Sequence, residues 1–488
     1  MSKFEMSKLK FFLLLFCIIN VDVFSQEIKK ITLEDCIAIA QERSPLAHIA
    51  KNNQKNRYLN YKAFNAGLLP QINLTANVPG LSRSITQIRQ NDGTYQFMPI
   101  SQLNSSGGLK INQIFAATGT QISIFSGLTR FDQLENNEFL QWGATPLQIA
   151  IIQPLFQYNS LYWDNEIEEL KFNKSESEYT QDMENIAQMA TQKFFDVYIA
   201  QMNVRNAEFN VATNDTLFIL SKGRYNVGKI AENDLLQSEL ALLNARNDLE
   251  NAKLEQNNAI EELSLYLNIK ETNYEIVPPL EFRQFEVSID KAIDEAVKNR
   301  PTLVDLNIKE LEAERSLNSI ESKYGFSATV SAGFGYNQSA GVLQDAYKNL
   351  FEQQDVNINL QIPLFLWGKS SAEIEVAMNN QQNVSNQNEQ DRKKFEIDVR
   401  YQVSKFKLLQ NQVILAQKAD TIATRRFDVA KNRYIIGKID MTQLFIAQNE
   451  KDNAFRTFIQ TLRSYWIAYY DLRKQTLYDF EKNSIIKY

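Results

Sequence analysis

Histidine and cysteine are almost missing from this chain of 488 residues, which has one histidine, His48, and two cysteines, Cys17 and Cys36. Zinc sites in proteins are built mostly from several histidine and cysteine ligands, so a lone His48 predicts a surface or packing residue and we expect no metal site here. Cys17 lies in an N-terminal apolar run that we expect to be removed. Cys36 then has no partner for a disulfide within the chain, and should pack on the apolar face of a helix.

An excess of basic residues is also missing. Lysine and arginine number 52 against 58 aspartates and glutamates, a net charge of −6 at pH 7. No basic stretch is interleaved with aromatic residues, which argues against nucleic-acid binding. We also find no glycine-rich phosphate loop, no evident pair of catalytic carboxylates and no His/Cys/Asp cluster. The sequence therefore predicts neither an enzyme nor a cofactor-binding protein.

The N-terminus has the pattern of a secretory signal. Lysines precede the apolar run Phe11–Ile19, and Val23-Phe24-Ser25 follows it. The run is too short to span a membrane, which disfavours a retained signal anchor. We expect residues 1–25 to be a signal peptide. Beyond it, no stretch of about 20 apolar residues predicts a membrane helix.

Glycine and proline are absent from four long stretches, at 155–222, 229–277, 369–436 and 438–488. They are joined in pairs by two related turns, Arg224–Ile230 and Arg433–Ile439, which lie 209 residues apart. Gly228 and Gly437 can adopt the left-handed conformation that ends a helix. We therefore expect two helical hairpins, with long helices at about 160–226 and 231–267, and at about 369–435 and 440–475. A helix of about 65 residues is roughly 100 Å long.

Residues seven positions apart form a mostly apolar seam before each turn, which favours supercoiled helices. The first seam is Ala190, Val197, Val204, Val211, Phe218 and Tyr225, and the second is Val399, Phe406, Val413, Asp420, Phe427 and Tyr434. Taken alone, this feature is equally typical of an ordinary coiled coil.

The chain is an internal duplication. The segment Thr32–Pro45 aligns with Ser288–Pro301 at an offset of 256 residues, and each predicts a short helix followed by a helix that begins at proline. We divide the chain after the signal into a first repeat at 26–269, a linker at 270–287, a second repeat at 288–475 and a tail at 476–488.

Four segments alternate between apolar and polar residues, at about 71–80, 147–156, 327–336 and 355–365. Their length of about ten residues is that of a tilted membrane β-strand. The polar face carries Asn, Gln, Ser and Thr with almost no charge. The alternative interpretation is a sheet of a soluble protein with one face exposed to water.

An insertion of 47 residues separates the first two strands, because Pro154 and Pro363 are 209 residues apart while the starts of the repeats are 256 apart. It lies within 79–145. It contains a hairpin, Leu109–Phe115 and Gln121–Phe125, around Thr118-Gly119-Thr120. We expect this insertion at the end of the strands away from the helices, outside the cell.

Four strands cannot close a membrane barrel, and lipid tolerates no open sheet edge. Several chains must share one barrel, and three copies would give 12 strands. The fold class we expect is an α+β membrane protein. Its long coiled-coil hairpins form an α-barrel, and a β-barrel with four strands per chain is shared between subunits.

On these features, with the paired turns and the strand-ending Pro154-Leu155-Phe156 and Pro363-Leu364-Phe365, the chain resembles the TolC-like outer-membrane efflux family. The resemblance implies a homotrimer with a 12-stranded outer-membrane barrel and a periplasmic tunnel of 12 helices. It implies a passive exit duct of a Gram-negative efflux or type I secretion system. Partners would be a periplasmic adaptor, an inner-membrane pump of RND or ABC type, and outer-membrane lipid. The alternative is a periplasmic coiled-coil adaptor or scaffold.

The resemblance also assigns roles to the turns. Adaptor docking would involve Val227, Gly228, Lys229, Ile230, Ile436, Gly437, Lys438 and Ile439. Candidates for the periplasmic gate are Tyr225, Asp234, Tyr434 and Asp440, and Tyr434 matches the family tyrosine three residues before the glycine. Gln443 and Ile446 stand where the best-known members have aspartates. As alternatives, both aspartates are helix N-terminal acids and Tyr434 is a heptad-core aromatic.

Overall fold

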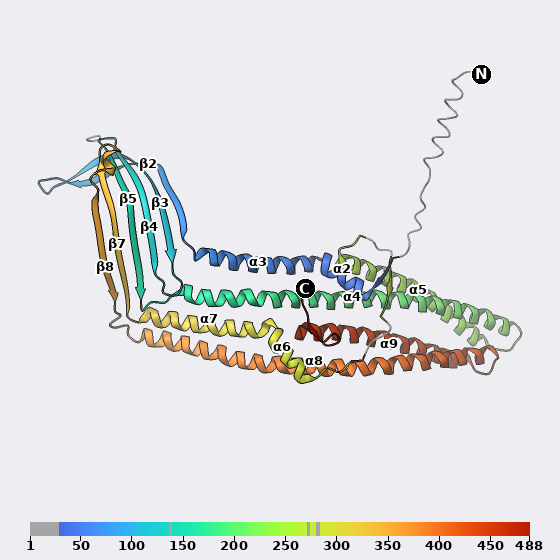
Figure 1. Cartoon of the computed structure of the whole chain (residues 1–488). Coiled ribbons are helices and arrows are strands. Elements are labelled where there is room, and N and C mark those ends of the chain that lie inside the picture. The colour runs from blue at the N-terminus through green and yellow to red at the C-terminus, as the bar shows by residue number, and fades with distance from the viewer. Residues whose placement is uncertain (1–28, 136–138, 271–273, 280–283) are drawn as a thin grey trace, which may run out of the picture. The chain divides into compact units, whose positions relative to one another are not determined.

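The computed structural model describes residues 29–135, 139–270, 274–279 and 284–488 (Figure 1). The expected signal at 1–25 and part of the linker at 270–287 lie outside the described residues. The chain divides into two compact units. We call residues 1–48, 185–286 and 405–471 the tip unit, and residues 49–184, 287–404 and 472–488 the sheet unit.

The helices recur in matched pairs. In order, these are α2 (Leu33–Arg43) with α6 (Ile289–Asn299), α3 (Pro45–Gly67) with α7 (Pro301–Tyr324), α4 (Ser160–Asn226) with α8 (Lys369–Ile435), and α5 (Glu232–Leu267) with α9 (Met441–Thr476). Both α4 and α8 have 67 residues, so each is about 100 Å long. The expected long helices are confirmed. No helix among the described residues is apolar over a length sufficient to cross a membrane.

The short helices begin at side-chain caps. The Thr32 hydroxyl accepts a hydrogen bond from the Asp35 N–H, and the Asp35 carboxylate accepts from the Thr32 N–H. Ser288 caps α6 in the same way through the N–H of Lys291. These bonds satisfy backbone donors that have no partner inside the first turn. Pro301 then opens α7, as its missing N–H allows.

The tip unit packs α2 against the long helices. Leu33 and Cys36 on α2 are fully buried, as are Phe194 on α4 and Leu263 on α5. Strand β1 (Lys29–Thr32) pairs in parallel with β6 (Tyr274–Val277). The Cys36 sulfur lies 4.0 Å from the Ala190 carbonyl oxygen, and burial raises the pKa of its thiol to about 12. The expected packing role of Cys36 is confirmed.

The heptad seam is buried most completely in α8. Phe406, Val413, Phe427 and Tyr434 are all buried, with Asp420 half-buried among them. In α4 the seam opens toward the turn: Val211 and Phe218 are half-buried, and Tyr225 is exposed. The two hairpins therefore differ in packing although their sequences repeat.

The sheet unit contains one antiparallel sheet of six strands, in the order β2-β3-β4-β5-β7-β8 (Figure 1). The strands are β2 (Gln71–Arg89), β3 (Tyr95–Ile114), β4 (Gln121–Gln133), β5 (Phe139–Leu155), β7 (Ser327–Ala340) and β8 (Phe351–Gln361). Strands β2 and β8 form its two edges.

The expectation of four strands per chain is wrong, because β3 and β4 lie inside the ladder between β2 and β5. The predicted hairpin at 109–125 exists, with Ile114 paired to Gln121. Its turn, however, lies at the end of the sheet next to the helices, contrary to the expected position. A difference in repeat length counts inserted residues, but it cannot distinguish an external loop from two added strands.

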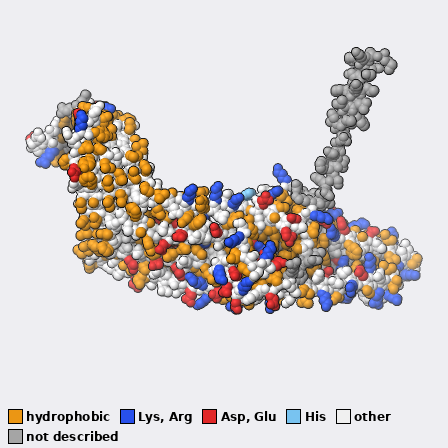
Figure 2. All heavy atoms as spheres, viewed as in Figure 1, with side chains coloured by type: hydrophobic (Ala, Val, Ile, Leu, Met, Phe, Trp, Pro, Cys, Tyr) orange, Lys and Arg blue, Asp and Glu red, His pale blue; other side chains and the backbone are white. Residues whose placement is uncertain are grey.

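One face of the sheet is apolar and exposed. Leu74 on β2 is 77% exposed and Val356 on β8 is 76% exposed. Figure 2 shows hydrophobic side chains gathered over the strands, with charged groups concentrated elsewhere. An exposed apolar surface of this kind marks contact with lipid or with another chain.

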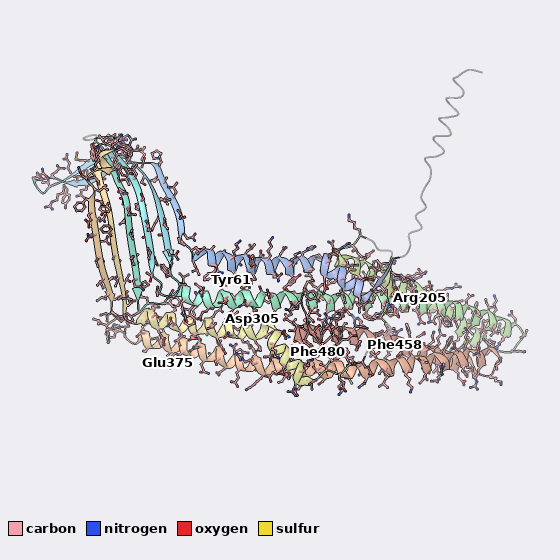
Figure 3. The ribbon with its side chains drawn as sticks, in the orientation of Figure 1. Tyr61, Arg205, Asp305, Glu375, Phe458 and Phe480 are labelled. Atoms are coloured by element: carbon pink, nitrogen blue, oxygen red, sulfur yellow. The ribbon has the colours of Figure 1, made fainter. Side chains whose placement is uncertain are left out.

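The C-terminal tail is attached within the sheet unit. Arg473 forms a bidentate ion pair with the fully buried Glu184, with N···O distances of 2.8 and 3.0 Å. The Tyr488 hydroxyl donates to the same carboxylate at 2.5 Å. Strands β9 (Tyr478–Asp479) and β10 (Ser484–Ile485) pair beside them. The ring of Phe480, which is labelled in Figure 3, lies 5.0 Å from the ring of Tyr478.

Candidate functional site

The turn after α4 is closed by two backbone hydrogen bonds. The Gly228 N–H donates to the Tyr225 carbonyl at 2.8 Å, and the Lys229 N–H donates to the Arg224 carbonyl at 2.9 Å. Gly228 has φ +70°, in the left-handed region. This is the Schellman pattern, which satisfies carbonyls that have no partner in the last helical turn.

The turn after α8 repeats this geometry. The Gly437 N–H donates to the Tyr434 carbonyl and the Lys438 N–H to the Arg433 carbonyl, both at 2.9 Å. Gly437 has φ +76°. A Cβ added at either turn glycine would meet nothing within 4 Å. Glycine is therefore required here, as predicted, by the left-handed backbone conformation and not by a lack of space for a side chain.

Tyr434 lies in the core between the two turns. Its side chain is 5% exposed and belongs to a buried cluster made of Leu217, Phe427, Tyr434, Met441, Leu444 and Ala447. Its hydroxyl lies 3.3 Å from the Ser221 hydroxyl on α4. The interpretation of Tyr434 as a heptad-core aromatic is therefore confirmed, and its hydroxyl joins the two hairpins.

Arg224 also connects the two turns, and the sequence did not single it out. Its Nη2 donates to the carbonyls of Tyr434 and Ile435, each at 3.3 Å, and its guanidinium lies 5.1 Å from the Tyr434 ring centroid. A basic residue in the last turn of a helix commonly bonds helix C-terminal carbonyls. Here the carbonyls belong to the other hairpin, so position in sequence could not reveal the contact.

The two turn tyrosines occupy different environments. Tyr225 is 40% exposed, whereas its repeat partner Tyr434 is buried. The structure thus brings Tyr434 together with Arg224 and Ser221, and leaves Tyr225 at the surface of the tip unit.

The two candidate aspartates lie at helix starts. Asp440 precedes α9, and its Oδ1 accepts a hydrogen bond from the Gln443 N–H at 2.8 Å. Asp234 lies in the first turn of α5 and is half-buried. Negative charge is favourable at both places because the N-terminal end of a helix carries partial positive charge.

The turn residues expected at a docking surface fall into two groups. Val227 and Ile436 are 67% and 65% exposed, and Lys229 and Lys438 are exposed beside them. Ile230 and Ile439 are half-buried, and Ile439 packs against the Tyr434 cluster. Each turn therefore presents one exposed apolar and one exposed cationic side chain, beside an isoleucine that is half-buried.

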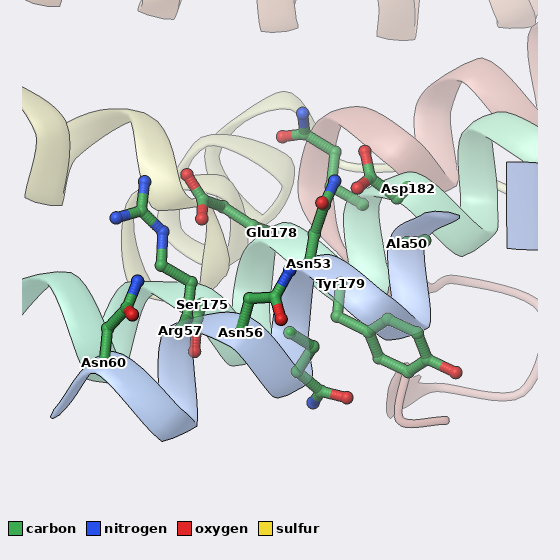
Figure 4. A pocket seen from close by; sticks show the side chains of 11 residues that line it. Ala50, Asn53, Asn56, Arg57, Asn60, Ser175, Glu178, Tyr179 and Asp182 are labelled. Carbon is green, nitrogen blue, oxygen red and sulfur yellow. The ribbon is translucent and has the colours of Figure 1, made fainter. Parts of the chain in front are cut away.

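A separate hollow lies in the sheet unit between α3 and α4 (Figure 4). Asn53, Asn56 and Asn60 line its α3 side, and Asp182 lies on its α4 side. Burial, followed by the nearby charge of Glu178, raises the pKa of Asp182. The amides do not titrate, so they supply no acid or base. Within the described residues no group of three or more His, Cys, Asp and Glu side chains could hold a metal ion.

Comparison with known proteins points in one direction. A family model described as outer membrane efflux protein matches residues 37–268 and 292–476. No curated protein matches the sequence.

Several solved structures have a similar fold. The CmeC outer membrane channel of Campylobacter jejuni has 16% identity and a TM-score of 0.64, covering 91% of this chain and 85% of that one. The outer membrane protein VceC of Vibrio cholerae has 14% identity and a TM-score of 0.63, and the match covers 91% of this chain and 95% of that one. The MtrE outer membrane channel of Neisseria gonorrhoeae has 15% identity and a TM-score of 0.61, and the match covers 91% of this chain and 88% of that one.

Proposed function

The chain belongs to the outer membrane efflux protein family, and we propose that it is the trimeric outer-membrane channel of a tripartite efflux or type I secretion system. It is a passive duct from the periplasm of a Gram-negative bacterium to the exterior. Its partners are a periplasmic adaptor and an inner-membrane pump of RND or ABC type. The observation that carries this function is the family match over both repeats.

The sheet supports a membrane location. Its exposed face is apolar, as at Leu74 and Val356, and its edge strands β2 and β8 are open. Lipid excludes an open edge, because unpaired N–H and C=O groups cost several kcal/mol each there. Three chains that join edge to edge remove every open edge. A periplasmic adaptor or scaffold would need no such sheet.

We assign adaptor docking to the two turns. Val227 and Ile436 offer apolar contact, and Lys229 and Lys438 add positive charge around it. Gly228 and Gly437 set the tight reversal that presents them, Ile439 packs against the Tyr434 cluster, and Ile230 is half-buried at the equivalent position. Six such turns in a trimer form a ring that a helical hairpin of the adaptor can contact.

We assign the periplasmic gate to the contacts between the two turns. Tyr434 holds α8 to α4 through Ser221 and through Arg224, which also bonds the end of α8. Tyr225, Asp234 and Asp440 remain our further candidates for the gate: Tyr225 follows Arg224 in the chain, and the two aspartates stabilise the starts of α5 and α9. Loosening the junction would let the hairpins separate and widen the entrance. Because family members are channels, we assign the chain no catalytic activity.

Fractionation and export assays test this function. Detergent extracts of the outer membrane should contain the chain with the mass of three copies. Gly228→Trp or Gly437→Trp should abolish export without loss of trimer or membrane insertion, because the turn would no longer present its docking surface. A soluble monomer in the periplasm would overturn the proposal.

A further inference from the structure

Strands β3 and β4 continue the apolar face of the sheet without a break. Ile72 on β2 pairs with Ile111 on β3, which pairs with Ile124 on β4. Ile124 pairs with Ile149 on β5, and Ile149 pairs with Phe334 on β7. Five neighbouring strands thus place an apolar side chain at the same level and on the same face. A hairpin exposed to water on this face would carry polar side chains at this level, and would not continue the apolar row of its neighbours.

The opposite face is mainly polar or small at the adjacent level. The row across the six strands is Gln71, Asn112, Ser123, Ala150, Gly333 and Asp355. Alternation between an apolar outer face and a polar inner face is the pattern of membrane barrels that enclose water. The two added strands therefore follow the same inside and outside assignment as the strands that connect to helices.

The turn between β3 and β4 is fixed where the helices meet the sheet. Asn159, which directly precedes α4, donates through Nδ2 to the Ala116 carbonyl at 2.6 Å. Gln153 on β5 donates to the Thr118 carbonyl at 3.2 Å. Gln113 donates to the carbonyl of Leu68, directly after α3, at 2.6 Å. The added hairpin therefore crosses the full height of the sheet and turns back at its helix end.

Side-chain packing also locks the hairpin. The Phe125 ring lies over Gly108 on β3 and Gly127 on β4, where an added Cβ would come within 2.6 and 2.5 Å of ring atoms. A side chain at either position would force the Phe125 ring to move, because the ring occupies the space that the two glycines leave open. The register between β3 and β4 is thus specified by shape as well as by backbone pairing.

We propose that this protein forms an 18-stranded barrel, with six strands from each of three chains, and hence an exit wider than a 12-stranded barrel. This inference rests on the proposed trimeric function. The edges that close the barrel are β2 of one copy and β8 of the next. Because barrel diameter grows roughly linearly with strand number, 18 strands give an exit about 1.5 times as wide as 12.

The wider barrel requires no additional helices. The added hairpin enters and leaves through the sheet itself, so each chain still supplies two long helical hairpins, α4–α5 and α8–α9. The helical ring keeps its helix count while the barrel gains strands.

Cysteine labelling at the two ends of the added hairpin tests the inference. Ala117 lies exposed in the β3–β4 turn, and Asn91 lies exposed in the turn between β2 and β3 at the opposite end of the sheet. The wild-type background is low because Cys36 is buried. With a membrane-impermeant maleimide, Asn91→Cys should react in intact cells, and Ala117→Cys only after the outer membrane is permeabilised.

Equal labelling of Ala117→Cys and Asn91→Cys in intact cells would overturn the inference, because both turns would then lie outside. Electron cryomicroscopy of the wild-type trimer provides a measurement that needs no variant. The expected map shows 18 strands, and 12 strands in an outer-membrane trimer would overturn the wide barrel alone. Absence of the chain from the outer membrane would instead refute the proposed function.

Discussion

Residues at equivalent positions of the two repeats have different roles. Arg224 and Arg433 each stand four positions before a turn glycine, yet Arg224 bonds the other hairpin while Arg433 is exposed. Tyr434 is buried where Tyr225 is exposed. Each repeat thus supplies one side of the contact between Arg224 and Tyr434. For each of these residues, the equivalent residue of the other repeat provides a matched control.

Two glycines near the end of α4 should respond in opposite directions to alanine. Gly228→Ala forces a side chain into φ +70° and should cost about 1 kcal/mol. Gly223→Ala places alanine in a helix with no atom within 4 Å, and should stabilise by about 0.5–1 kcal/mol. Hydrogen exchange at the amides of residues 220–228 should quicken in the first variant and slow in the second. A change of the same sign in both would contradict the conformational argument.

A buried carboxylate and an exposed one should differ strongly in their contribution to stability. Glu184→Ala leaves Arg473 with only part of its buried ion pairing and should cost about 3 kcal/mol. Glu250→Ala removes an exposed pair with Lys253 and should leave the midpoint of thermal unfolding unchanged. Circular dichroism in detergent measures the midpoint of thermal unfolding. Equal midpoints for the two variants would show that other contacts hold the tail.

At the scale of the helix, α8 contains one acid in its apolar seam. Burial raises the pKa of Asp420, although Lys451 opposes the shift. The folded state thus binds the proton more tightly than the unfolded chain, so stability should rise as pH falls through the folded pKa toward about 4, the ordinary aspartate value.

Asp420→Asn removes this charge, and should stabilise the protein at neutral pH while flattening that rise. The difference in unfolding midpoint between wild type and variant, measured from pH 7 to pH 4, isolates the group. The advantage of the variant in unfolding midpoint should shrink as pH falls, because Asp420 is then protonated in the wild type. An advantage that grows as pH falls would contradict the prediction.

The helices could be predicted from the sequence more completely than the strands. Absence of glycine and proline, with a glycine at each turn, predicts α4 and α8 because helix formation depends on local rules. Strand β3 contains Gly107 and Gly108, and β4 contains Gly127, and these glycines weaken a local strand signal. The place of the two strands in the ladder depends on pairing with distant residues such as Ile72 and Ile149, and local alternation cannot show it.

At the scale of the whole molecule, the same limit applies to the candidate site. The left-handed glycines and the exposure of Val227 and Ile436 follow from turn chemistry that the sequence displays. The contact of Arg224 with the end of α8 joins residues 210 and 211 positions apart. It depends on how two hairpins pack, so no local pattern contains it.

That contact leads to a prediction for the assembled channel. Arg224→Ala removes two hydrogen bonds to the end of α8 and the cation above the Tyr434 ring, so the hairpins should separate more readily. Single-channel conductance in planar bilayers should rise. Tyr434→Phe loses only the hydroxyl contact with Ser221 and should raise it less.

Arg433→Ala is the matched control, because it removes the same charge at the equivalent position of the other hairpin. If charge near the entrance determined conductance, both arginine variants would change it alike. If the junction between the hairpins determines it, only Arg224→Ala should raise conductance, while both variants remain trimeric in detergent. Equal conductance of Arg224→Ala and wild type would place the gate away from the Arg224–Tyr434 junction, because the entrance would then stay closed without the two hydrogen bonds from Arg224 to the end of α8.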